Sequence, residues 1–513
     1  DVSQSQHLEG IRSRLTSLHR GLAEILASRE SPYQSKRAQL PLILLITPEI
    51  TYLPQGMGNL AQVITGLKGG GLADISASLF HALYDMGANV HVGLPRYKKM
   101  IAQGRDITGE EVRRLEQATI KDHEINRLHL LRDPIFTNAD RVYSNDSDTN
   151  FERAAALVRL AGNLMYSLAS HSQYMAVHVN DWMTGLIPGE AKSQGIPSVF
   201  TWHNIHTMEK TGAELRSKGV SLLRYWQDLY FKEHPGDDYR ESPDCHTFNH
   251  KPVDFLLSGL NAADIINTVS PTFLKEVVEG QPHIVTRVNK EIQRVVARRD
   301  EEGSARGILN CPGASTDPRH NQHLAANYWV TESGNGVLNL RDGRLINKIE
   351  FQDQMGFTID PSKKVLFWPH RLSEQKGVEL LYQGLFPLLE DHPELYVAVV
   401  GDGKPWDKKF TDYSDQNIFG GRFRYQIFEE GLSELGKAGS DLMLMPSIYE
   451  PSGLPQMECQ IYGTLPIVFA TGGLVDTVEE LSEDGSTGNG FIFHEHTPEK
   501  MREAVSRAMN FAY

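Results

Sequence analysis

Short runs of Val, Ile and Leu alternate with helix-like stretches along most of this chain of 513 residues. The first run is Leu42–Ile46, and apolar residues at helical spacing follow it at Leu72, Ile75, Leu79 and Leu83. Continuous apolar strands that alternate with helices are typical of parallel sheets covered by helices on both faces. The pattern therefore predicts an α/β fold built on doubly wound parallel sheets.

The alternation occurs twice, on either side of a polar segment at about 298–356. The strands predicted before this segment are Leu42–Ile46, Ala88–Leu94, Val177–Val179, Ser198–Trp202 and Ile265–Val269. Those predicted after it are Val365–Trp368, Leu395–Val400, Leu442–Met445, Leu465–Ala470 and Gly490–Phe493. We expect two Rossmann-like domains, at 41–305 and 306–513, that face a central cleft. An irregular insertion is expected near 315–355, with a hairpin-like turn at Glu332–Gly336.

The first 40 residues do not follow the strand and helix alternation. Apolar residues recur there at helical spacing between polar positions, at Leu8, Ile11, Leu15, Leu18 and Leu22. This spacing predicts an amphipathic helix that packs onto a domain or a partner. We therefore expect an N-terminal helical extension at 1–40.

Charge and composition exclude several classes of protein. The chain has 51 Lys and Arg against 65 Asp and Glu, a net charge of −14, whereas a nucleic-acid binder shows a basic face. A small anion remains compatible, because a local basic cleft can exist on an acidic protein. The longest apolar run, Leu42–Ile46, is far shorter than the roughly 20 residues of a membrane span. Cys245, Cys311 and Cys459 lack metal-ligand spacing and indicate reduced thiols, so we expect a cytoplasmic protein without nucleic-acid or membrane partners.

A glycine-rich turn precedes the first predicted helix and has the sequence Lys68-Gly69-Gly70-Gly71. Glycines let a ligand approach the backbone, and a helix N-terminus offers free N–H groups to a phosphate. The spacing fits neither the dinucleotide-binding pattern nor the P-loop. The turn is therefore either a phosphate site, to which Lys68 adds a point charge, or a flexible connection.

Polar clusters also follow two successive predicted strands in the first half, at His178–Trp182 and Thr201–Asn204. Because the carboxyl ends of parallel strands meet at one edge of a sheet, these clusters predict a polar site at that edge. Asp181 is suited to accept hydrogen bonds from hydroxyl groups, and it is equally suited to cap the next helix.

The second half carries two further clusters directly after predicted strands. Arg371 and Lys376 suit a diphosphate, since Arg binds it bidentately and Lys acts as a point charge; the alternative is a solvated basic pair. Glu450 opens the segment Glu450–Gln456 and would face the cleft, where sugar hydroxyls or a ribose donate to its carboxylate. A helix cap is the simpler interpretation of Glu450.

Taken in order, these clusters resemble the bacterial and plastid glycogen and starch synthases, a family of retaining glucosyltransferases with the two-domain GT-B fold. The similarity extends from about Leu42 to Phe493. The matching stretches are Lys68–Asp74, His178–Trp182, His203-Asn204, Thr268–Pro271, Gly307–Asn310, Arg371–Gly377, Glu450–Gln456 and Thr471–Leu474.

The resemblance implies transfer of glucose, with retention at the anomeric carbon, from ADP-glucose or UDP-glucose to the non-reducing end of glycogen, starch or a maltooligosaccharide. It implies no cofactor and no metal, and a plastid stroma location if the source is a plant or an alga; a homo-oligomer is left open. The catalytic residues that it implies are Arg371, Lys376, Glu450, Asp181 and His203. The donor contacts that it implies are Lys68, Gly70, Gly71, Phe428, Ser452, Gly453, Leu454 and Glu458, and those on the acceptor side are Asp181, Trp182 and Asn204.

Each implied role has a physical basis. Arg371 and Lys376 would neutralise the departing nucleoside diphosphate, and Glu450 would hold the donor glucose. Phe428 would stack on the nucleotide base, and such stacking accepts adenine or uracil alike, so the donor base stays open.

Several positions depart from the family pattern. Gly69 stands where the family has Thr, Ser452 stands where it has Cys, and Cys311–Gly313 replaces Gly-Ile-Asp. Glu458 restores a spacing from Glu450 that is typical of sucrose synthases and related transferases. These differences leave two alternatives: a GT-B transferase with a small sugar or sugar-phosphate acceptor, and a catalytically degenerate glucan-binding regulatory protein.

The string Asp146-Ser147-Asp148 suggests a different chemistry, because such a pair holds a diphosphate-bridging metal in the other major glycosyltransferase fold. It lies in a run of Ser, Asn, Asp and Thr whose composition indicates an exposed loop. Since Arg371 and Lys376 already supply positive charge, we expect no metal at this string.

Overall fold

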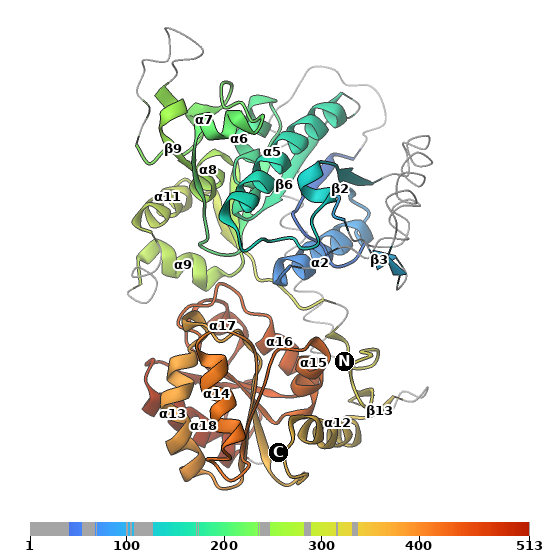
Figure 1. The fold of residues 1–513 in the computed structure, drawn as a ribbon, viewed down its shortest axis with the longest axis vertical. Coiled ribbons are helices and arrows are strands. Elements are labelled where there is room, and N and C mark those ends of the chain that lie inside the picture. Colours follow the sequence, from blue (N-terminus) through green and yellow to red (C-terminus); the bar gives the residue numbers. More distant parts are fainter. Residues whose placement is uncertain are drawn as a thin grey trace. The chain divides into compact units, whose positions relative to one another are not determined.

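The computed structural model describes residues 40–53, 67, 69–98, 101–102, 105–106, 127–170, 172, 174–233, 235, 247–281, 289–313, 316–330 and 337–511. These residues form two compact units (Figure 1). Unit 1 extends to Ile308, apart from Ser270–Glu276 and Gln281, which belong to unit 2 together with the residues from Leu309 onward. Residues 1–39 of the predicted extension and the turn at 332–336 lie outside the described residues.

The described part of unit 1 is built on a parallel sheet of seven strands in the order β11-β10-β7-β6-β1-β2-β5. Its central strand β1 pairs with β2 and β6, so that Leu44 lies beside His91 and Val177. All five residues of β1 are buried, as its apolar sequence predicts. The strands are β1 (Leu42–Ile46), β2 (Asn89–Pro95), β5 (Leu128–Leu131), β6 (Met175–Asn180), β7 (Ser198–Trp202), β10 (Ile265–Thr268) and β11 (Ala305–Gly307).

Helices connect these strands. Those described are α2 (Gly71–Asp85), α4 (Pro134–Thr137), α5 (Ser147–Ala169), α6 (Ile187–Ser193), α7 (Gly212–Ser217), α8 (Phe255–Ala262), α9 (Pro271–Glu279) and α11 (Lys290–Glu301). The part of α9 up to Glu276 belongs to unit 2. Short 3₁₀ turns are η1 (Trp182–Thr184), η2 (Trp226–Asp228) and η4 (Thr247–His250). Two small antiparallel pairs complete the unit, β3 (Ile101–Ala102) with β4 (Arg105–Asp106) and β8 (Glu209–Thr211) with β9 (Pro252–Asp254).

The described part of unit 2 contains a second parallel sheet, of six strands in the order β16-β15-β14-β17-β18-β19. The strands are β14 (Lys364–Trp368), β15 (Leu395–Val400), β16 (Phe423–Gln426), β17 (Leu442–Met445), β18 (Leu465–Phe469) and β19 (Phe491–Phe493). The helices are α12 (Leu340–Met355), α13 (Val378–Asp391), α14 (Trp406–Asp415), α15 (Glu430–Gly439), α16 (Pro455–Tyr462), α17 (Gly472–Thr477) and α18 (Pro498–Asn510), with the 3₁₀ turn η6 (Glu374–Lys376).

Helices cover both faces of this second sheet. Leu366 and Trp368 of β14 pack in one apolar cluster with side chains of α13 and α18. The alternate residues Val365 and Phe367 pack in another cluster with side chains of α12 and α15. In each unit the first strand lies inside the sheet, and the strand order reverses beside it, at β1/β6 and at β14/β17. This is the doubly wound arrangement, and the two predicted Rossmann-like domains are confirmed.

The expected irregular segment is wrong for much of its length. The helix α12 occupies Leu340–Met355, where Asn339 caps its first turn and Gly356 ends it in the left-handed conformation. The sequence of α12 is largely polar, so no apolar helical pattern indicated this helix. The short strands β12 (Tyr328–Trp329) and β13 (Leu338–Asn339), which flank the predicted hairpin, pair in parallel rather than antiparallel.

Within the two large parallel sheets, three of the described strands are not predicted from the sequence: β5, β11 and β16. Each lies at or near an edge of its sheet and has polar or charged residues among its three or four positions. In the part of the chain that the structure describes, no helix combines the length and hydropathy that crossing a membrane requires.

Candidate functional site

Ligands of doubly wound sheets bind beyond the carboxyl ends of the strands, where the strand order reverses. In unit 1 this edge carries the residues that follow β1, β6 and β7. In unit 2 it carries the residues that follow β14, β17 and β18. Most of the predicted site residues that the structure describes follow strands at these edges, whereas Glu458 lies within helix α16. Lys68 lies outside the described residues.

A buried carboxylate organises the glycine turn of unit 1. Glu49 follows β1, and its carboxylate accepts hydrogen bonds from the backbone N–H groups of Gly69 and Gly70, the latter at 2.9 Å. The hydroxyl of Tyr143 donates to the same carboxylate at 2.9 Å. Burial raises the pKa of Glu49, although these hydrogen bonds oppose the shift.

This contact changes the interpretation of the turn. From the residues alone, the turn is either a phosphate site or a flexible connection, and the family resemblance implies that Gly70 and Gly71 contact the donor. In the structure, the side-chain carboxyl group of Glu49 accepts the hydrogen bonds from the amides of Gly69 and Gly70 at the start of α2. Sequence reasoning missed Glu49, because no spacing rule links a single acid after a strand to glycines about one loop later.

Asp181 and His203 come together at the carboxyl edge of the same sheet. Asp181 follows β6 with a φ of 62°, and its Oδ1 accepts a hydrogen bond from the backbone N–H of His203 at 2.9 Å. Burial raises the pKa of Asp181 to about 7, and the charge of Glu49 adds to the shift. Burial lowers the pKa of His203 to about 3, aided by the charge of His178, so this imidazole is neutral.

The other residues predicted on the acceptor side lie beside this pair. Trp182 opens η1 and meets Phe255 edge-on, with ring centroids 6.5 Å apart. The side-chain oxygen of Asn204 accepts a hydrogen bond from the N–H of Ile205 at 2.7 Å, which shapes the turn after β7. Trp182 keeps part of its surface exposed to solvent, as a sugar contact requires.

The titration of Asp181 should be visible in the stability of the protein. Because burial raises its pKa to about 7, the folded protein holds this proton more tightly than the unfolded chain. The stability that the protonated carboxyl contributes is therefore full below the ordinary pKa of 3.8 and is lost as the pH rises through about 7.

Asp181→Asn should remove this loss. Between pH 5 and pH 8, urea unfolding should show a smaller decrease in the free energy of unfolding for the variant than for the parent protein. An equal decrease in both proteins would show that Asp181 does not titrate in this range.

In unit 2, the predicted phosphate ligand Lys376 is paired with the predicted sugar ligand Glu450. The ammonium of Lys376 contacts Oε2 of Glu450, and the hydroxyl of Ser447 donates to the same oxygen at 3.0 Å. The side chains of Lys376 and Glu450 are only 14% and 8% exposed, so the pair is largely shielded from water. The sequence predicted both residues but not their contact.

Gly377 lets the loops that carry this pair approach each other. It has a φ of 72°, and a Cβ atom placed on it would lie 2.0 Å from the carbonyl oxygen of Pro446. A side chain at this position would therefore separate the loop after β14 from the loop after β17. Such a separation would pull Lys376 away from Glu450.

Arg371 differs from Lys376 in that its side chain has no partner among the described residues. Its side chain is exposed, and it forms no hydrogen bond or ion pair with any residue that the structure describes. The preceding His370 is buried, with Nε2 lying 3.2 Å from the carbonyl oxygen of Leu444, and burial holds its pKa well below the usual value. The buried His370 anchors the loop, and the Arg371 guanidinium is left available for an anion.

The turn after Glu450 is held by a second glycine-rich turn. The N–H of Gly473 donates to the carbonyl of Glu450 at 3.0 Å, and a Cβ atom on Gly472 would lie 2.0 Å from that carbonyl oxygen. From the other side, the side-chain amide of Gln456 donates to the carbonyls of Ser452 and Gly453 at 3.1 and 3.2 Å. Gln456 was matched only as part of the motif, and the structure shows it fixing this turn.

Two further donor residues have different surroundings. Phe428 follows β16 at the carboxyl edge, and its side chain is 53% exposed, which suits a stacking surface. Glu458 instead contacts the buried ammonium of Lys437 at 2.6 Å, and Lys437 also contacts Glu434. Glu458 is therefore held by the protein through one of its carboxylate oxygens.

The acidic string in the first half has partners within the protein. Asp146 caps α5 through the N–H of Thr149 at 2.9 Å, and Asp148 forms an ion pair with Lys210 at 3.1 Å. Among the described residues, no group of three or more His, Cys, Asp or Glu side chains is placed to hold a metal ion.

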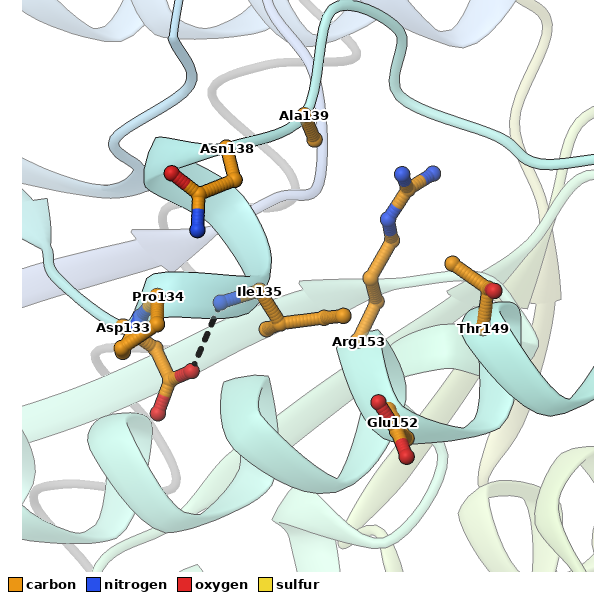
Figure 2. Close-up of a pocket in the computed structure, with 8 residues that line it drawn as sticks. All are labelled: Asp133, Pro134, Ile135, Asn138, Ala139, Thr149, Glu152 and Arg153. Atoms are coloured by element: carbon orange, nitrogen blue, oxygen red, sulfur yellow. Dashed lines mark hydrogen bonds between the residues drawn. The ribbon is translucent and has the colours of Figure 1, made fainter.

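An open pocket of about 480 Å³ lies between α4 and the first turns of α5 (Figure 2). Its lining contains none of the predicted site residues and consists of Asp133, Pro134, Ile135, Asn138, Ala139, Thr149, Glu152 and Arg153. Asp133 is already engaged by the N–H of Ile135 and by Arg159, at 2.9 and 2.5 Å. This pocket lies outside the candidate site.

The chain is similar to known proteins over most of its length. Residues 43–287 match the family model of the starch synthase catalytic domain, and residues 351–511 match that of the glycosyl transferases group 1. The chain is 31% identical to a glycogen synthase from Cellvibrio japonicus, over 86% of this chain and 89% of the relative. It is 32% identical to a glycogen synthase from an Anaeromyxobacter species, over 88% and 90% of the two chains.

A solved structure supports the fold. The catalytic domain of starch synthase IV from Arabidopsis thaliana, determined with ADP and acarbose, superposes with a TM-score of 0.69. The alignment covers 92% of each chain at 22% identity. At this identity the likeness extends to the arrangement of helices and strands.

Proposed function

The chain belongs to the glycogen and starch synthase family, and on that basis we propose that it is an α-1,4-glucan glucosyltransferase with a nucleoside-diphosphate glucose as donor. The observation that carries the proposal is the pairing of Lys376 with Glu450 at the reversal of strand order in unit 2, on a loop after β14 that also carries the exposed Arg371. This arrangement brings two cations and one carboxylate to the sheet edge where ligands bind. A sugar diphosphate carries the complementary groups, two phosphates and a ring of hydroxyls.

Each residue has a task in the proposed reaction. Arg371 binds the diphosphate bidentately, and Lys376 adds charge to the phosphate oxygen that departs. Glu450 accepts hydrogen bonds from hydroxyls of the donor glucose and at the same time holds Lys376 in place. In unit 1, Asp181 and His203 are assigned to hydroxyl groups of the glucose and the acceptor.

The covalent step needs no enzyme nucleophile in this proposal. The bond between the anomeric carbon and the diphosphate oxygen breaks, and the bond to the acceptor hydroxyl oxygen forms on the same face of the sugar. The proton of that hydroxyl passes to the departing phosphate oxygen. The anomeric configuration is therefore retained, and the products are the extended glucan and the nucleoside diphosphate.

We infer that the reaction uses no cofactor and no metal. Two cationic side chains are assigned to the diphosphate, and the acidic string Asp146–Asp148 is engaged in a helix cap and an ion pair. Glu458, which motivated a transferase with a small acceptor, is engaged by Lys437, so this residue does not favour that alternative. Since the site residues of both units are retained, we also favour an active enzyme over a degenerate binding protein.

The experiment that tests the function is a donor and acceptor panel. ADP-glucose and UDP-glucose are each incubated with glycogen, maltooligosaccharides or fructose 6-phosphate, and nucleoside diphosphate release is measured with and without EDTA. We expect release with at least one donor that depends on glycogen or maltooligosaccharides and is unaffected by EDTA. Release that requires fructose 6-phosphate, or that EDTA abolishes, would contradict the proposal.

Phe428 provides a test of the donor site. Because stacking of a base on an aromatic ring contributes about 1–3 kcal/mol, Phe428→Ala should raise the donor KM by about 10- to 100-fold with a smaller change in kcat. The matched control is Ile427→Ala, since Ile427 is the exposed apolar neighbour, 69% exposed. If both substitutions raise the donor KM equally, Phe428 is not the stacking residue.

A further inference from the structure

Asn180, the last residue of β6, and Asp181, which follows it, both contact His203, one at its imidazole ring and the other at its backbone N–H. The side-chain oxygen Oδ1 of Asn180 lies 3.1 Å from Nε2 of the His203 imidazole. The carboxylate of Asp181 accepts the hydrogen bond from the backbone N–H of His203 at 2.9 Å. The positive φ of Asp181, 62°, turns the chain so that these neighbouring side chains reach the same residue.

The chemistry of Asn180 fixes the state of the imidazole. An amide oxygen only accepts hydrogen bonds, so Nε2 of His203 must carry the proton. A neutral imidazole has one proton, and Nδ1 is therefore left as an acceptor. Nδ1 forms no hydrogen bond with the residues that the structure describes.

The surroundings keep His203 neutral. Its near neighbours that titrate are His178 on β6 and Asp181 after it, and Asp181 in turn faces Glu49 and Tyr143. His178 is buried, with Nε2 lying 2.7 Å from the hydroxyl of Thr201, and burial lowers its pKa to about 4. Asn180 is itself only 2% exposed, so its contact with the imidazole is protected from water.

We propose that Asn180 is a positioning residue, which locks His203 in the tautomer with the proton on Nε2 and thereby presents Nδ1 as the acceptor for a sugar hydroxyl. This proposal rests on the proposed function only for the identity of the sugar. Asn180 acts through the imidazole and makes no contact with the reacting atoms. With the opposite tautomer, Nδ1 of His203 would carry a proton and could no longer accept a hydrogen bond from that hydroxyl.

The tautomer is tested without turnover. The full-length protein is labelled with ¹⁵N-histidine, and the His203 signals are assigned by comparison with His203→Gln. We expect the parent protein to show the proton on Nε2 and no titration of His203 between pH 5 and pH 8. A proton on Nδ1 would overturn the proposal, whether or not the enzyme is active.

Asn180→Asp replaces the neutral amide beside Nε2 of His203 with a carboxylate. A carboxylate beside the imidazole favours the imidazolium, so His203 should now titrate between pH 5 and pH 8. Since protonated Nδ1 cannot accept a hydroxyl, kcat of the variant relative to the parent should fall about 10-fold from pH 8 to pH 6. An unchanged His203 signal or a constant ratio of kcat would overturn the proposal.

The control is Asn267→Asp on β10, which also places a buried carboxylate in this sheet, next to Thr201 rather than His203. It should leave the His203 titration unchanged, which separates a specific effect from general destabilisation.

If Asn180→Asp fails to fold, Asn180→Ser provides a second test, because Ser keeps an acceptor oxygen on a shorter side chain. Its expected signature is a mixture of both His203 tautomers, and a single Nε2–H tautomer would overturn the proposal.

Discussion

Replacing Arg371 with Ala lowers kcat by about 10³-fold and leaves the free energy of unfolding nearly unchanged. The loss is large because the guanidinium neutralises the charge that develops on the departing diphosphate. Removing one preorganised hydrogen-bond donor from such a site lowers the rate by a factor of about 10²–10³, and removing a catalytic Arg can lower it further. Stability is spared because the side chain is exposed and has no partner among the described residues. Steady-state kinetics and urea unfolding of the same preparation give both quantities.

Two variants define this result. Arg371→Lys should recover part of the activity, since it restores the charge but not the bidentate geometry. Lys363→Ala removes a partly exposed cation just before the amino end of β14, the edge opposite the site, and should leave kcat unchanged. An Arg371→Ala enzyme with kcat near that of Lys363→Ala would contradict the assignment of Arg371 to the diphosphate.

Breaking the pair between Lys376 and Glu450 should cost both stability and activity. Lys376→Met or Glu450→Gln leaves one shielded charge without its partner, and such a loss destabilises by about 3–5 kcal/mol. The activity of each variant should fall by about 10³-fold, because the phosphate loses a cation or the glucose loses its carboxylate. Urea unfolding and kcat measurements check the two effects separately.

The double variant separates these effects. Lys376→Met combined with Glu450→Gln leaves no uncompensated charge, and the Gln oxygen still accepts the hydrogen bond from Ser447. Most of the lost stability should therefore return, whereas the activity should remain as low as in the weaker single variant. Recovery of activity together with stability would show that the pair is structural and takes no part in transfer.

The sheets were largely predictable because their strands are buried on both sides. An apolar run such as Leu395–Val400 has no alternative to the centre of a sheet, and the structure places it there. The edge strand Phe423–Gln426 and the helix Leu340–Met355 escaped prediction, because polar residues interrupt the apolar pattern of each. In the helix some of these polar residues, such as Asn347 and Gln352, are buried and hydrogen-bonded. The elements that could be recognised from the sequence were therefore those with continuous runs of buried apolar residues.

The site was predictable as a set of positions but not as a set of contacts. Residues such as Arg371 and Glu450 were found because motifs follow strands, and the ends of parallel strands meet. The hydrogen bonds from Gly69 and Gly70 to Glu49, and the ion pair of Lys376 with Glu450, join segments that are far apart in sequence. Such pairings depend on how loops pack, and a single sequence carries no signal for them.

The position and configuration of the transferred glucose test the central claim most directly. Radiolabelled ADP-glucose or UDP-glucose is incubated with unlabelled glycogen, and the polymer is then digested with β-amylase, which releases maltose from α-1,4-linked non-reducing ends. We expect the polymer to become labelled and the label to appear as maltose early in the digestion. Label that resists β-amylase, or a polymer left unlabelled by both donors, would contradict it.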